Sequence, residues 1–185
     1  MLILAVYGIV VAGRWWRRRA PEFELDEAEL GIGNHKIKFR PNYEDLQVAF
    51  RLWTELRTRK IGLPIDEEHD VIVEVYDSWY EFFRIARELI KTIPVTKFRR
   101  SESTQQLVAI SVDVLNRGLR PDLTRWQARF RRWWRYAGED PANRELSPQE
   151  MQRQFPEYSA LLKDMRDVNV RMLAYAKALE RMVNP

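Results

Sequence analysis

Apolar residues recur at steps of three and four along most of the chain, which is the spacing of one face of an α-helix. Such runs cover about residues 42–59, 66–93, 101–118, 122–137 and 147–183. The strongest run, 66–93, has the stripe Ile72, Val75, Tyr76, Trp79, Phe82, Phe83, Ala86, Leu89, Ile90 and Ile93. The run 101–118 is apolar on almost every side, which predicts a central, buried helix.

Start and stop signals bound these runs. Asn42 with Asp45, and Ser147-Pro148-Gln149-Glu150, have the spacing of helix N-caps. Asn116-Arg117-Gly118 predicts the end of the third helix, and the prolines, Pro121 among them, fall between periodic runs or at helix starts. Pro156 marks the start of the last helix or a break in it. The sequence therefore predicts an all-α bundle of four to five helices.

Residues 30–39 alternate apolar and basic positions around Gly33-Asn34, which favours a small β-hairpin. The resulting organisation has three parts. Residues 1–19 form an N-terminal segment, residues 20–41 a linker or small hairpin, and residues 42–185 the helical bundle.

The N-terminus joins an uncharged apolar block, residues 1–13, to a basic-aromatic cluster. That cluster consists of Arg14, Trp15, Trp16, Arg17, Arg18 and Arg19. As a helix the block reaches about 20 Å, which is short for a hydrocarbon core of about 30 Å. A cleaved signal peptide, a buried core helix and the tail of a longer apolar segment are alternatives. Tryptophan and arginine at the polar end favour a membrane anchor, with the following chain cytoplasmic.

Composition narrows the choice of chemistry. The 185 residues are 45% hydrophobic and 31% charged, as expected for a domain that folds in water. The absence of cysteine excludes disulfides, zinc-thiolate sites and cysteine nucleophiles. The chain has two histidines, no glycine-rich phosphate loop and no nucleophile elbow. We therefore expect no catalytic residues, no metal, no cofactor and no small-molecule substrate.

An acidic ladder follows the second run at helical spacing. Its members are Glu67, Asp70, Glu74, Asp77 and Glu81. They lie opposite the apolar stripe, which predicts a solvated face or an electrostatic docking face. A di-iron bundle needs two inward-facing Glu-x-x-His motifs, and the chain offers one Asp-x-x-His, at Asp66 to His69.

The fourth run is basic and aromatic. It holds five arginines against one aspartate, for a net charge of +4, equal to that of the whole chain. Its candidate contact residues are Arg125, Arg129, Arg131, Arg132, Trp133, Trp134 and Arg135. They suit phosphate and base binding, an anionic bilayer, or pairing with the acidic ladder of the same or a neighbouring protomer. The structural alternative is that Trp126, Phe130 and Trp133 are core and the arginines their solvated rim.

These patterns predict a non-enzymatic, membrane-anchored protein. Its cytoplasmic bundle is expected to bind a protein partner or to form a homo-oligomer, as an adaptor or effector. The alternative is a nucleic-acid-binding protein that uses the basic run 122–137.

Overall fold

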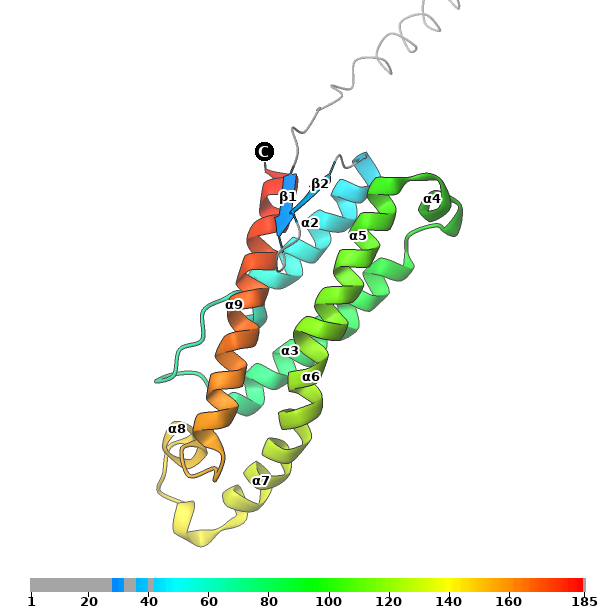
Figure 1. Cartoon of the computed structure of the whole chain (residues 1–185). Helices are drawn as coiled ribbons and strands as arrows, with labels where there is room; N and C mark the ends of the chain where they lie inside the picture. Colours follow the sequence, from blue (N-terminus) through cyan, green and yellow to red (C-terminus); the bar gives the residue numbers. More distant parts are fainter. Residues whose placement is uncertain (1–27, 32–35, 40–41, 185) are drawn as a thin grey trace, which may run out of the picture.

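The structure is a computed structural model that describes residues 28–31, 36–39 and 42–184 (Figure 1). Residues 42–184 are entirely helical, which confirms the predicted all-α class for this part of the chain. This part holds six helices when the continuous run from Glu102 to Glu139 is counted as one. The predicted membrane segment, residues 1–19, lies outside the described residues.

The α-helices are α2 (Tyr43–Arg57), α3 (Ile72–Lys91), α4 (Val95–Arg100), α5 (Glu102–Asp113), α6 (Arg120–Asp122), α7 (Ala128–Glu139), α8 (Pro148–Gln152) and α9 (Tyr158–Val183). Two π-helical segments, η2 (Val114–Leu119) and η3 (Leu123–Gln127), join α5, α6 and α7 without a break. Two short 3-10 turns, η1 (Lys60–Gly62) and η4 (Pro141–Asn143), follow α2 and α7.

Both predicted N-caps are present. The Asn42 side chain accepts from the backbone N–H groups of Glu44 and Asp45, and the Asp45 carboxylate accepts from the Asn42 N–H in return. Ser147 and Glu150 form the same reciprocal pair at the start of α8. The last run is divided at Pro156, since α8 ends at Gln152 and α9 begins at Tyr158.

Helix α3 begins later than predicted, at Ile72 instead of near Asp66. The Asp66 carboxylate accepts from the backbone N–H groups of Glu68 and His69, which stabilises a turn ahead of the helix. Gln152 on α8 then accepts the Ile72 N–H at 2.9 Å. A local turn at Asp66 and a contact from α8 therefore together set the start of this helix.

The third and fourth predicted helices are one continuous helix, so the predicted stop at Asn116-Arg117-Gly118 is wrong. Pro121 lies inside this helix, where a proline ring normally clashes with the carbonyl four residues earlier. In the π-helical turn before it, the Arg120 N–H bonds to the Leu115 carbonyl five residues back. The wider turn accommodates the proline without ending the helix.

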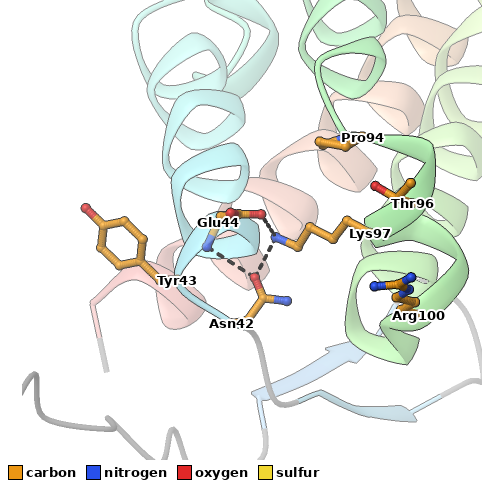
Figure 2. Close-up of a pocket in the computed structure, with 7 residues that line it drawn as sticks. All are labelled: Asn42, Tyr43, Glu44, Pro94, Thr96, Lys97 and Arg100. Atoms are coloured by element: carbon orange, nitrogen blue, oxygen red, sulfur yellow. Dashed lines mark hydrogen bonds and ion pairs between the residues drawn. The ribbon is translucent and has the colours of Figure 1, made fainter. Parts of the chain in front are cut away.

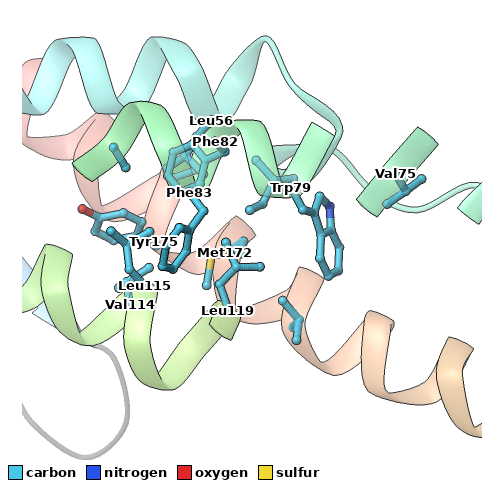
Figure 3. Close-up of a cluster of buried hydrophobic side chains, with 14 of the residues drawn as sticks. Leu56, Val75, Trp79, Phe82, Phe83, Val114, Leu115, Leu119, Met172 and Tyr175 are labelled. Carbon is cyan, nitrogen blue, oxygen red and sulfur yellow. The ribbon is translucent and has the colours of Figure 1, made fainter. Parts of the chain in front are cut away.

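The hydrophobic core runs between α2, α3, the long helix and α9 (Figure 3). Trp79 and Phe82 of α3 are fully buried there, as is Leu119 of η2, and Met172 of α9 is 1% exposed. The predicted stripe of α3 is buried from Ile72 to Ala86, which confirms that face. The expected burial of 101–118 holds only in part, because Leu107, Val114 and Leu115 are buried whereas Val112 is 41% exposed.

The helical bundle is elongated, with two opposite ends (Figure 1). We call the end that holds the start of α2, helix α4 and the end of α9 the proximal end, and the end that holds α7 and α8 the distal end. Strands β1 (Ala28–Gly31) and β2 (Lys36–Phe39) pair antiparallel, with Ala28 opposite Phe39, beside α9. The turn of the expected hairpin, residues 32–35, is outside the described residues.

Candidate interaction site

The aromatic side of the basic helix forms part of the core. Trp126 and Phe130 are fully buried. The Phe130 ring packs edge-on against Phe155 at 5.2 Å and stacks on Trp134 at 5.8 Å. Trp133 lies 5.3 Å from Phe155 and, like Trp134, is partly buried. These indoles are therefore packed within the molecule.

Two of the five arginines bind acids at the start of α9. Arg125 contacts Asp164 at 2.7 Å, and Arg129 pairs with Glu157. Both guanidinium groups also lie over the Trp126 ring, at 4.6 and 5.2 Å from its centre. They cover a buried aromatic residue and join the long helix to α9.

The third arginine meets the acidic ladder within the same chain. Arg131 donates to Asp77 of α3 at 2.8 Å, with both side chains about half exposed. At this contact a predicted arginine of 122–137 meets a predicted carboxylate of the acidic ladder. Arg131 therefore has an intramolecular partner on the neighbouring helix.

Arg132 and Arg135 remain on the outer side of α7. Both are exposed, and within the described ranges neither forms an ion pair. The Arg132 guanidinium lies 6.0 Å from the centre of the Tyr136 ring, and Tyr136 is 58% exposed. We name Arg132, Arg135 and Tyr136 the distal basic face.

The acidic ladder does not form one continuous helix face. Glu67 and Asp70 precede α3, because the helix begins at Ile72. Asp70 contacts Lys60 at 2.8 Å, and Glu67 pairs with Arg166 of α9. Glu81 pairs with Arg84 one turn along α3, which lowers the pKa of the Glu81 carboxyl.

Glu74 lies on α3 between these pairs and is exposed. With Asp77 on Arg131, four of the five ladder carboxylates have basic partners inside the chain. The expected docking face is therefore divided among separate local contacts.

The described residues hold no grouping of three or more metal-ligating side chains. His69 Nδ1 lies 2.9 Å from the Asp66 carboxylate on the surface. His35 and the basic-aromatic cluster, Arg14 to Arg19, fall outside the described ranges. Among the helices described, none combines the length and apolar character needed to cross a bilayer.

A buried polar cluster at the proximal end was not predicted as a site. The Asp45 carboxylate is 1% exposed and accepts from Ser103 at 2.6 Å and from Thr104 at 2.8 Å. Lys97 of α4 contacts it at 3.3 Å. The capping residues Asn42 and Asp45 gave the sequence signal, but their partners are more than fifty residues away.

A shallow hollow of about 600 Å³ adjoins this cluster (Figure 2). Asn42, Tyr43, Glu44, Pro94, Thr96, Lys97 and Arg100 line it. Within it the Lys97 ammonium donates to Asn42 Oδ1 at 2.7 Å and contacts Glu44 at 2.6 Å. Lys97 therefore fastens α4 to the start of α2.

A second unpredicted feature lies where the long helix crosses α3. Asp122 is 5% exposed, and in the part of the chain described neither of its carboxyl oxygens has a hydrogen-bond partner. Burial raises the pKa of this carboxyl to about 6, and the nearby Tyr76 hydroxyl opposes the rise. Burial and the Asp122 charge raise the pKa of Tyr76. The sequence suggested only a helix start at this aspartate.

A second hollow, of about 950 Å³, lies beside the turn before α3. Its lining includes Lys60, Asp66, Glu67, Arg153 and Tyr158. Lys60 and Glu67 are already paired with Asp70 and Arg166, so the hollow presents mixed and largely neutralised charge.

No protein-family model matches the chain, and comparison with curated proteins and with solved structures finds no similar protein.

Proposed function

We propose that this protein acts by binding, as a membrane-tethered adaptor or effector. Its N-terminal segment serves as the tether, and the bundle lies on the cytoplasmic side. The distal basic face contacts an acidic surface of another protein or of a second copy of the chain. The proposal assigns the chain no reaction.

The tether rests on the sequence of residues 1–19, an apolar block followed by arginine and tryptophan. This segment is connected to the bundle through Asn42, at the proximal end. The distal end is therefore the part of the bundle farthest from the attachment point (Figure 1). A contact surface at that end is accessible to partners.

The observation that carries the binding role is the difference among the five arginines of 122–137. Arg125, Arg129 and Arg131 are paired with acids of neighbouring helices. Arg132 and Arg135 point outward without such partners among the described residues, next to an exposed tyrosine. Arginine and tyrosine are enriched in protein interfaces, and guanidinium groups favour carboxylate partners.

Nucleic-acid binding is the second candidate, supported by the same two arginines. Binding to single strands commonly depends on aromatic rings on which bases stack. Trp133 and Trp134 are packed against Phe130 and Phe155, which leaves Tyr136 as the exposed ring on α7. We therefore favour a protein partner.

The test begins with fractionation of cells that express the full chain or a chain starting at Ala20. We expect the full chain to resist alkaline carbonate and to need detergent, and the shorter chain to be soluble. Release of the full chain by carbonate would contradict the tether.

Crosslinking of the full chain then tests the distal basic face. Arg132→Glu with Arg135→Glu should reduce the yield of the product that links the chain to its partner or to a second copy at least tenfold. The two substitutions place negative charges against an acidic partner surface. Arg51→Glu with Arg57→Glu makes the same charge change on exposed positions of α2 and should leave the product unchanged. Equal losses in both variants would contradict a specific distal contact. Salt-sensitive binding of an oligonucleotide through Arg132 and Arg135 would favour the second candidate.

A further inference from the structure

Helix α4 is an exposed element with apolar and basic side chains. It has six residues, none of them buried. Val95 is 67% exposed and Phe98 is 40% exposed. Burial of these side chains within the bundle therefore does not account for the position of the helix.

Polar contacts hold α4 in place instead. Lys97 extends inward to Asn42, Glu44 and the buried Asp45 (Figure 2). Gln105 of α5 donates to the Phe98 carbonyl at 2.8 Å. The one lysine of the helix is thus used for attachment, which fixes the positions of the other side chains.

The outward charges of α4 are Arg99 and Arg100. Both are exposed, and among the residues that the structure describes neither has an acidic partner. Tyr43, 75% exposed, projects from the first residue of α2 at the same end of the molecule, on the side of α2 that faces away from α4 (Figure 2). Two guanidinium groups therefore accompany two apolar side chains and a tyrosine at one end of the molecule.

This combination suits the surface of an anionic bilayer. Arginine binds lipid phosphates, tyrosine favours the headgroup region, and valine and phenylalanine enter the acyl boundary. The location agrees with this chemistry, since α4 lies at the proximal end, where the chain from the N-terminal segment enters the bundle. Only residues 20–41 separate the basic-aromatic cluster from Asn42.

We propose that Tyr43, Val95, Phe98, Arg99 and Arg100 form a docking face for anionic lipid. This inference rests on the proposed membrane tether and deepens it, because docking orients the bundle. With the proximal end on the bilayer, the distal basic face points away from the lipid. A single short apolar segment would then hold the protein in one orientation.

The absence of cysteine allows a site-specific test on the full chain. Thr96→Cys places one environment-sensitive dye on α4, and Ala128→Cys places one on the exposed side of α7. The labelled chains are reconstituted into vesicles of phosphatidylcholine alone or with 30% phosphatidylserine, each containing brominated lipid. We expect quenching at position 96 only in the anionic vesicles, and none at position 128.

Charge and apolar variants test the face itself. Arg99→Ser with Arg100→Ser should weaken docking on the order of 30-fold, as about fivefold per arginine implies. Val95→Ser with Phe98→Ser should abolish quenching at position 96, whereas Arg51→Ser with Arg57→Ser should leave it unchanged. Circular dichroism checks that each variant keeps its helix content.

The outcomes separate the two proposals. If the full chain stays with the vesicles but position 96 remains unquenched in both compositions, docking is overturned and the tether stands. If the full chain does not stay with vesicles, the tether fails, and anionic vesicles added to the soluble chain decide docking by the same readout. A dye response to an oligonucleotide, with none to anionic lipid, would overturn the lipid assignment.

Discussion

The buried carboxylates of Asp45 and Asp122 illustrate two opposite environments at the scale of single residues. Asp45 accepts hydrogen bonds from Asn42, Ser103 and Thr104, which compensate for its burial. Asp122 has no such donor among the described residues, and its pKa rises to about 6. The first aspartate stabilises a junction of elements, whereas the second carries an electrostatic cost.

Asp122 should make stability depend on pH. Its pKa in the folded state is about 6, above its ordinary value of 3.8. The group therefore has no effect below about pH 4, where it is protonated in both states, and lowers stability as pH rises from about 4 to 6. The loss above pH 6 should approach about 3 kcal/mol.

Asp122→Asn should remove this loss. We expect the variant to be more stable than the natural chain at pH 8 and similar to it at pH 4, measured by urea denaturation. Asp113→Asn is the control, because Asp113 lies on the same long helix but is partly exposed and paired with Arg117. Equal pH profiles for the natural chain and Asp122→Asn would contradict the assignment.

At the scale of elements, the long helix from Glu102 to Glu139 owes its continuity to the two π-helical segments. Gly118 lies in the first of these, where a Cβ would meet the Met172 methyl group of α9 at 2.9 Å. The absent side chain lets α9 approach the wide turn closely. The π-helical turn η2 is therefore also the place where the long helix packs against α9.

Glycines at two other element ends should respond in opposite directions. A Cβ on Gly62 in η1 would collide with the backbone of Leu56, whereas one on Gly138 in α7 meets nothing within 4 Å. Gly62→Ala should therefore destabilise the fold by about 2 kcal/mol or more, through forced backbone movement. Gly138→Ala should stabilise it by up to about 1 kcal/mol, because alanine is the better helix former.

Thermal unfolding of both glycine variants checks these expectations. The two substitutions add the same methyl group, so each serves as the control for the other. A neutral Gly62→Ala variant would show that η1 can move away from α2.

At the scale of the whole molecule, α3, the long helix and α9 are held together both by buried aromatic side chains and by exposed ion pairs. Four exposed pairs connect distant elements, namely Arg125 with Asp164, Arg129 with Glu157, Arg131 with Asp77 and Arg166 with Glu67. Solvent screens such pairs, so each contributes at most about 1 kcal/mol. Beneath them Trp126 is fully buried and donates to Asp164 at 2.9 Å.

The free energy of unfolding should therefore fall more when Trp126 is removed than when the exposed ion pairs are screened by salt. We expect Trp126→Ala to cost about 3–5 kcal/mol. Raising sodium chloride from 0.05 to 1 M should cost less than about 2 kcal/mol, because it screens only the exposed pairs. Urea denaturation measures both effects.

Tyr136→Ala is the matched control, since Tyr136 lies on the same helix and is 58% exposed. It should change stability by less than about 1 kcal/mol. A salt effect larger than that of Trp126→Ala would show that the ion pairs dominate the folding of the distal end.

Local patterns alone were sufficient for part of this picture. Helical spacing identified the buried face of α3, and the residues Asn42 and Ser147 identified the starts of α2 and α8, because these features depend on neighbours within a few residues. The helical character of the arginine-rich run and the division of the last run at Pro156 depend equally on local sequence. The all-helical class of residues 42–184 followed from the same periodicity.

Tertiary structure decided which charged residues are available for binding. The arginines of 122–137 look alike in sequence, but acids from α3, α9 and the turn before it pair with three of them and leave Arg132 and Arg135 outward. It also decided that the helix continues through Pro121, because the wide turn before the proline packs closely against Met172 of α9. Sequence patterns report local preference, whereas burial and pairing depend on residues that are distant along the chain.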